Sequence, residues 1–222
     1  MNGFDHNESL TDCLANFAPT RYEVTRSLAL FSAAIADSSD TNLRAAIEIC
    51  LNQNADPKQL YEVALQSYLF LGFPRMLIAV EALSALLPKG SLSHQPLELS
   101  PDDLTDWFER GQELCRQVYG SSYDALKTRV QKMAPEVFLW MELEGYGKVL
   151  SRPGLGIIDR EMSIVACLTM ENRNSQLHSH LRGALNVGAE PQLVRDVISD
   201  LSSASPEGHR SAREILSQLG VN

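Results

Sequence analysis

An internal repeat constrains the fold of this chain more than any other feature of its 222 residues. When the sequence is aligned with itself at a shift of 134 residues, similar residues coincide over a long run without gaps. The coinciding positions are Arg26 with Arg160, Leu43 with Leu177, Leu51-Asn52 with Leu185-Asn186, Ala55-Asp56-Pro57 with Ala189-Glu190-Pro191, and Glu62-Val63 with Asp196-Val197. After one deleted residue, the list continues with Ala79, Glu81 and Leu83 on Ala212, Glu214 and Leu216. Two amphipathic helical stretches share some similarity by chance, but the gapless run favours two fused copies of one helical unit.

The spacing of apolar residues predicts an all-α protein, because no stretch alternates in the manner of a half-buried strand. The predicted units are a first, degenerate helical repeat over 21–87, a Pro-, Ser- and Gly-rich linker over 88–101, and a second repeat over 102–222. Within the last unit we expect helices over 101–119, 123–130 and 134–150, the third loosened by Gly145 and Gly147. Residues 1 to about 20 are expected to form a loose arm.

The charge of the chain limits the partners it can have. A net charge of −9 without a basic stripe argues against nucleic acid as a partner, although local arginines could still bind a small anion. The most apolar stretch, 65–87, is interrupted by polar residues and proline, so a membrane span is not expected. The first residues lack the pattern of a signal peptide. We therefore expect a cytoplasmic protein.

The four cysteines are scattered along the chain, without a C-x-x-C pair or any cluster with the spacing of metal ligands. This pattern is typical of buried thiols in a reducing compartment, where they act as small apolar residues. No metal site is predicted.

The stretch 151–188 holds the most chemically suggestive residues. It reads as a loop followed by two helices, the first capped by Asp159 and apolar almost all round, the second ending near Gly188. Glu161 should face the core on the first helix, and a short turn could bring it next to His180 on the second. A carboxylate beside a histidine in an apolar setting can act as an acid–base pair. The alternatives are a Glu placed by the helix dipole and a merely packed histidine, and geometry alone does not choose between His180 and His178.

Several motifs resemble the carboxymuconolactone decarboxylase family, within the alkylhydroperoxidase D-like superfamily. The similar segments are Glu109-Arg110-Gly111, Val118-Tyr119-Gly120, the run from Gly147 through Arg152-Pro153-Gly154-Leu155, Asp159-Arg160-Glu161, and Gln176-Leu177-x-x-His180-x-x-x-Ala184-Leu185-x-x-Gly188. Gly72-Phe73-Pro74 resembles the family's Y-x-G-x-P element, with Phe70 in place of the tyrosine. The resemblance covers about half the chain well and the first repeat more faintly.

The resemblance implies tandem helical repeats, a homo-oligomer that would be a trimer of double units, and decarboxylation of a small carboxylated lactone without a cofactor, as in the catabolism of aromatic compounds. It assigns the proton donor to His180 rather than His178, with Glu161 orienting it. Arg152 or Arg160 would bind the carboxylate of the substrate, and Gly72, Phe73 and Pro74 would line the pocket.

Departures from the family pattern leave other functions open. The first copy carries Ser27 and Ala46 where the second has Glu161 and His180, so only one site per chain is expected. Where the superfamily's peroxidases carry two cysteines, this chain has Arg173 and Gln176, so a thiol relay is not expected. The alternatives to a decarboxylase are a non-catalytic helical scaffold or binding protein that kept the fold after duplication, and an alkylhydroperoxidase-like oxidoreductase that lacks the usual cysteine pair.

Overall fold

In a computed structural model, which describes residues 6–92 and 100–221, all regular structure is helical and no strand occurs within those ranges. This confirms the predicted all-α class. The helices of the first half are α1 (His6–Ala15), α2 (Glu23–Asp37), α3 (Asp40–Asn52), α4 (Pro57–Gln66), α5 (Tyr68–Leu71) and α6 (Phe73–Leu86). The second half contains α7 (Pro101–Tyr119), a 3₁₀ turn η1 (Gly120–Ser122), α8 (Tyr123–Met133), α9 (Pro135–Trp140), a π-helix η2 (Met141–Leu150), α10 (Ile157–Met170), α11 (Asn174–Asn186), α12 (Pro191–Asp200) and α13 (Pro206–Gln218).

The helix boundaries repeat with the shift found in the sequence. Helices α2, α3 and α4 each begin 134 residues before α10, α11 and α12, and α6 corresponds to α13 after the one-residue deletion. The copies differ in one element, since the short helix α5 of the first copy has only a turn in its place in the second. Helix α7, η1, α8, α9 and η2 form an additional helical segment ahead of the second copy.

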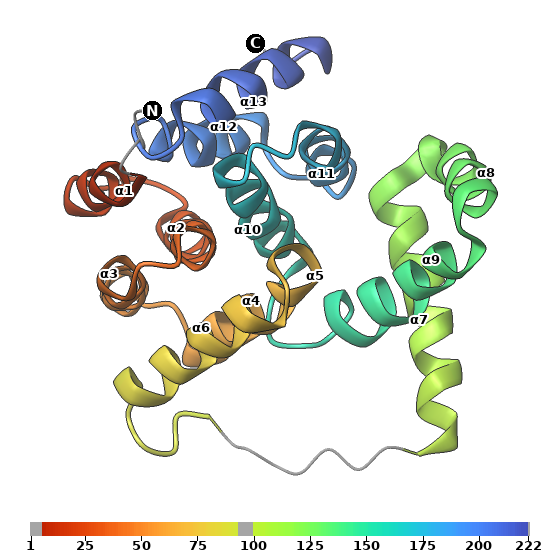
Figure 1. The fold of residues 1–222 in the computed structure, drawn as a ribbon, viewed down its shortest axis with the longest axis horizontal. Helices are drawn as coiled ribbons and strands as arrows, with labels where there is room; N and C mark the ends of the chain where they lie inside the picture. Colours follow the sequence, from red (N-terminus) through yellow and green to blue (C-terminus); the bar gives the residue numbers. More distant parts are fainter. Residues whose placement is uncertain (1–5, 93–99, 222) are drawn as a thin grey trace.

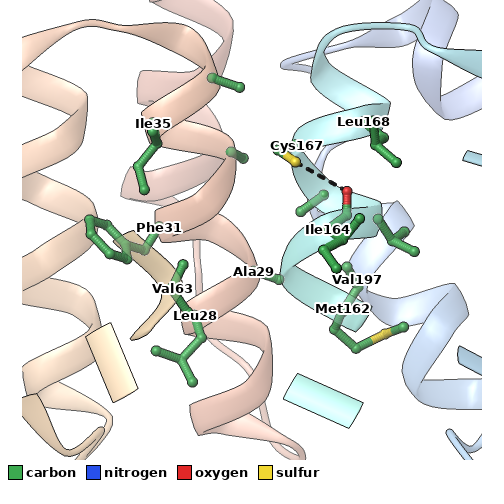
Figure 2. Close-up of a cluster of buried hydrophobic side chains, with 14 of the residues drawn as sticks. Leu28, Ala29, Phe31, Ile35, Val63, Met162, Ile164, Cys167, Leu168 and Val197 are labelled. Carbon is green, nitrogen blue, oxygen red and sulfur yellow. Dashed lines mark hydrogen bonds between the residues drawn. The ribbon is translucent and has the colours of Figure 1, made fainter. Parts of the chain in front are cut away.

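Helices α2 and α10 form the centre of the core, and they pack directly against each other (Figures 1 and 2). In α10, ten consecutive residues from Arg160 to Thr169 are buried, and in α2 the ten from Ser27 to Ala36 are buried. Small residues such as Ala29 and Ala33 on α2 allow this close approach, and Cys167 fills space beside them as a small side chain. A helix buried all round must have neighbours on every side, and α10 accordingly contacts α2, α5, α11, α12 and α13.

Polar contacts between the two copies follow the pattern of a twofold interface. The equivalent residues Thr25 and Asp159 meet each other, the Thr25 hydroxyl donating to Asp159 Oδ1 at 2.6 Å. Arg26 bonds Asp200 at 2.7 Å, while its equivalent Arg160 bonds Gln66, the equivalent of Asp200, at 3.1 Å. Residue i of one copy thus contacts residue j of the other and vice versa, as in an isologous dimer. The contacts between the two halves are therefore reciprocal at these positions.

Two glycines allow α7 and η2 to pack with their backbones in contact. A Cβ atom added to Gly111 would lie 1.8 Å from the carbonyl oxygen of Glu142, and one added to Gly147 would lie 1.9 Å from that of Trp107. The sequence predicted that Gly147 loosens its helix, but its role in the structure is to admit a neighbouring backbone.

Three further expectations need correction or lie outside the described residues. The predicted loose arm contains α1, whose Leu10 and Leu14 are buried against the rest of the chain, so this expectation was wrong for residues 6–15. Helix α10 begins at Ile157 after Gly156 without a side-chain cap, because Asp159 accepts from Thr25 instead. Within the predicted linker 88–101, residues 93–99 lie outside the described residues, and α7 begins at Pro101. In the described part of the chain, no helix is both long and apolar enough to cross a membrane.

Candidate functional site

Glu161 and His180 meet inside the second copy. Nδ1 of His180 lies 3.0 Å from Oε2 of Glu161, and the two side chains are 7% and 0% exposed. Glu161 lies in the first turns of the buried helix α10, and His180 lies on α11, which runs back along α10 after a tight turn at Asn172. The structure therefore brings together the pair that the sequence singled out.

A glycine in α11 permits this close approach. A Cβ atom on Gly183 would lie 2.7 Å from Cγ1 of Val118 and 3.2 Å from Oε2 of Glu161. Asn186, one turn further along, donates from Nδ2 to the carbonyl oxygen of Val118 at 2.8 Å. Helix α11 is thus held tightly against α7, and this packing fixes the position of His180 relative to Glu161.

His180 forms part of the wall of a cavity of about 250 Å³. Four aromatic residues contribute to the lining: Phe70, Tyr119, Trp140 and Tyr146. Aliphatic and thioether side chains supply most of the rest: Leu69, Val137, Met141 and Leu150. The ring of Phe70 contacts that of His180 edge to face, with centroids 5.2 Å apart. Because Nδ1 is held by Glu161, Nε2 is the ring nitrogen left to meet a molecule in this cavity.

The sequence analysis did not identify the aromatic residues of the cavity as site residues. They come from four separate elements, α5, α7, α9 and η2, and no local spacing connects them. Phe70 belongs to the first copy, so the cavity is built from both copies even though the Glu–His pair belongs to the second. The signal in the sequence was the position of Phe70, where the resembling family has a tyrosine.

Two tyrosine hydroxyls at the cavity remain protonated over the physiological pH range. Burial raises the pKa of Tyr119 to about 12, and the nearby carboxylate of Glu161 acts in the same direction. Burial likewise raises the pKa of Tyr146 well above its usual value, with further contributions from Tyr119 and Glu161. Neutral phenols of this kind can donate hydrogen bonds to a bound molecule.

One oxygen of Glu161 has no hydrogen-bond partner. Oε1 is fully buried and unpaired, while Oε2 contacts His180. Buried carboxylate oxygens are usually satisfied, and an exception calls for a reason such as a catalytic role. Two neighbouring residues of α10 also carry buried polar atoms without a partner, Nε of Arg160 and Oγ of Ser163.

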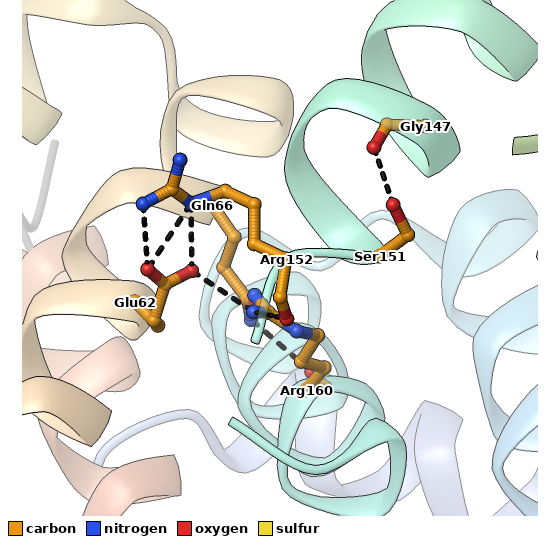
Figure 3. A network of polar contacts seen from close by, with 6 residues as sticks. All are labelled: Glu62, Gln66, Gly147, Ser151, Arg152 and Arg160. Carbon is orange, nitrogen blue, oxygen red and sulfur yellow. Dashed lines mark hydrogen bonds and ion pairs between the residues drawn. The ribbon is translucent and has the colours of Figure 1, made fainter. Parts of the chain in front are cut away.

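The two arginines proposed to bind a carboxylate both contact Glu62 instead (Figure 3). Arg152 approaches the Glu62 carboxylate with two nitrogens, at 2.9 and 3.1 Å, and Arg160 approaches it at 2.9 Å. Arg160 also bonds the carbonyl oxygen of Arg152 at 2.9 Å and the side chain of Gln66. The hydrogen bond to Glu62 raises the pKa of Arg152, whereas burial lowers that of Arg160. Neither residue lines the cavity at His180.

Gly72, Phe73 and Pro74 lie next to the cavity along the chain but do not line it. Gly72 adopts φ 82° between α5 and α6, and Phe73 is 58% exposed and stacks on Tyr68 at 4.8 Å. Leu69 and Phe70, which come just before this turn in the chain, line the cavity instead. His178 also lies elsewhere, on the side of α11 that faces α8.

Three of the four thiols are buried, whereas Cys13 is partly exposed. Cys50, Cys115 and Cys167 are buried, and burial raises the pKa of each to about 12. A thiol with so high a pKa carries almost no nucleophilic thiolate at neutral pH. No group of three or more potential ligands converges on a metal position among the described residues.

Comparison with curated proteins finds similarity to Peroxisomal protein 2 of Schizosaccharomyces pombe (strain 972 / ATCC 24843). The two sequences are 26% identical over 137 residues, which make up 61% of this chain and 63% of the relative. The match thus spans less than two-thirds of the relative's length. No family model matches the chain.

Proposed function

We propose that this chain is an enzyme that uses His180 as a general acid or base, positioned by Glu161, on a small molecule bound in the aromatic cavity. The observation that carries the proposal is the 3.0 Å contact between Nδ1 of His180 and the buried Glu161 at the wall of a cavity of about 250 Å³. A histidine held in this way has a fixed orientation and presents Nε2 to a ligand.

The chemistry we propose is decarboxylation of a small carboxylated lactone without a cofactor. The bond between the carboxylate carbon and the ring breaks and carbon dioxide leaves. The electron pair of the broken bond stays on the lactone and forms an enolate. A proton from Nε2 of His180 then forms the new carbon–hydrogen bond. The neutral hydroxyl of Tyr119, to which Tyr146 donates a hydrogen bond, is suited to donate in turn to the enolate oxygen, where negative charge develops.

The largely apolar lining supports this reaction class. None of the described residues that line the cavity is Arg or Lys, since Arg152 and Arg160 are engaged with Glu62. The one carboxylate among these lining residues, Glu144, accepts a hydrogen bond from the hydroxyl of Tyr68 at 2.9 Å. A carboxylate bound among aromatic side chains loses its hydration, and loss of carbon dioxide removes that buried charge. We propose that hydration loss, rather than a guanidinium clamp, acts on the departing carboxylate.

Variants of the two histidines test the proposal with 4-carboxymuconolactone as the probe, followed by ultraviolet absorbance. His180→Ala should lower turnover by roughly two to four orders of magnitude, the usual contribution of a general acid or base. Glu161→Gln should lower it less, because the amide preserves the hydrogen-bonding shape. His178→Ala is the matched control and should leave turnover near the parent rate. A folded His180→Ala variant that turns over the lactone at the parent rate would exclude His180 as the proton donor.

Two further proposals concern assembly and location. We propose that the chain forms a homo-oligomer, because Met133, Val137, Leu139 and Trp140 expose large apolar side chains around α9. The family resemblance favours a trimer. Light scattering of the purified chain tests this, and a monomer at micromolar concentration would contradict it.

We propose a cytoplasmic location, and a fluorescent fusion would distinguish it from the compartment in the yeast relative's name.

A further inference from the structure

We propose that a second pocket, between α8 and α11, binds a small oxyanion such as a carboxylate or a phosphate. This pocket of about 240 Å³ lies on the other side of Tyr119 from the aromatic cavity, and Tyr119 lines both. The proposal does not depend on the chemistry proposed for His180.

The polar groups of the pocket are of the kind that bind anions. Arg129 of α8 and Arg182 and His178 of α11 contribute nitrogen donors, and Ser122 and Ser179 contribute hydroxyls. No Asp or Glu lines the pocket. Arginine presents several N–H donors in one plane, which matches the paired oxygens of a carboxylate or phosphate, and serine hydroxyls complete such sites.

Neither Arg129 nor Arg182 forms an ion pair with a carboxylate among the described residues, a property they share with Arg110, Arg116, Arg210 and Arg213. Arginines with such a partner include Arg26 with Asp200, Arg75 with Glu171, and Arg152 and Arg160 with Glu62. The contact recorded for Arg182 is a long hydrogen bond of 3.4 Å from Nη1 to the hydroxyl of Ser122, which leaves the rest of its guanidinium free. On a chain with a net charge of −9, two unpaired arginines facing one hollow are a local concentration of positive charge.

The shape and surroundings of the pocket favour a small ligand over a polymer. A hollow of this volume accommodates a molecule of few atoms, whereas a nucleic acid or other polyanion needs an extended basic surface. The overall negative charge of the chain would repel such a polymer.

Isothermal titration of the full-length protein at low ionic strength tests the proposal, with inorganic phosphate and succinate as separate probes. We expect saturable binding of at least one probe, and the tighter of the two identifies phosphate or carboxylate as the natural oxyanion. Arg129→Gln and Arg182→Gln should each weaken that binding about tenfold or more, because each removes a charge-assisted contact.

Arg173→Gln is the matched control, because Arg173 is an exposed arginine at the start of α11 outside the pocket. It should bind the probe as the parent does. The pocket arginines are exposed, so thermal unfolding of all variants should agree and exclude loss of fold as the cause. The proposal is overturned if neither probe binds saturably, or if the two pocket variants bind as tightly as the control.

Discussion

Replacing Gly147 by alanine should disrupt the packing of η2 against α7, whereas the same change two residues earlier should not. A Cβ atom at Gly147 would lie 1.9 Å from the carbonyl oxygen and 2.6 Å from the carbonyl carbon of Trp107, and 3.1 Å from the carbonyl oxygen of Glu142. These are backbone atoms within helices, so no side-chain rotation relieves the contact. A Cβ atom at Gly145 would meet nothing within 4 Å.

The size of the effect follows from these distances. An ordinary contact needs at least 3.4 Å, so α7 and η2 would have to separate by about 1.5 Å along their shared face. Overpacking against side chains costs about 1–3 kcal/mol of stability. A backbone clash that separates two helices should cost as much as the upper end of this range or more. The higher helix propensity of alanine offsets at most about 1 kcal/mol of this loss in stability. We therefore expect Gly147→Ala to lower the free energy of unfolding by about 3 kcal/mol or more.

Urea unfolding followed by circular dichroism measures this difference, and Gly145→Ala provides the control on the same helix. The control gains helix propensity without a clash, so it should be neutral or more stable by up to about 1 kcal/mol. For a chain of this length, a loss of 3 kcal/mol corresponds to a decrease in Tm of about 6–12 °C. Equal free energies of unfolding for the two variants would refute the role assigned to Gly147.

Three other predictions concern buried polar groups. Burial raises the pKa of Asp159, so ionisation of this carboxyl disfavours the native state, and the free energy of unfolding decreases as pH rises through the native pKa. Asp159→Asn should therefore be more stable than the parent at pH 7. Urea titrations measure this gain, which should be absent near pH 3, where the carboxyl is protonated. Arg160→Met should cost about 3 kcal/mol in the same assay because it removes a buried partner of Glu62, and Arg152→Met should cost less because Arg152 is 37% exposed. Burial raises the pKa of Cys115 to about 12, so iodoacetamide at pH 8 should alkylate it at least about 100-fold more slowly in the native than in the unfolded chain.

The sequence was sufficient to predict the helical class, because it depends on local spacing. Apolar residues at helical intervals and the shift of 134 residues correspond to the observed pairs of helices, and α7 begins and ends at the expected residues. The expectation failed for α1, because its helix is stabilised by burial of Leu10 and Leu14 against distant parts of the chain. The π-helical form of η2 was also missed, since it accompanies backbone contacts with α7 that no local pattern encodes.

For the candidate site, the sequence identified residues separated by short, regular intervals and missed those joined only by tertiary structure. Glu161 and His180 lie on adjacent helices, so helical periodicity placed Glu161 near two candidate histidines, and the family resemblance selected His180 over His178. The partner of Arg152 and Arg160 is Glu62, about 90 residues away, so their engagement could not be inferred from neighbouring positions. Tyr119 and Tyr146 become candidate site residues only when α7 and η2 pack together.

The contact between α2 and α10 has a consequence for how the protein responds to dilution and to mutation. In a dimer of separate chains, such an interface opens when the protein is dilute, and every substitution occurs on both sides of the axis. Here the halves are covalently joined, so the contact between α2 and α10 is independent of protein concentration. A substitution also changes only one side, which is how Asp200 and Gln66 can occupy equivalent positions with different charges. The covalent link therefore allows one half to carry the Glu161–His180 contact while the other half supplies Phe70 to the cavity wall around it.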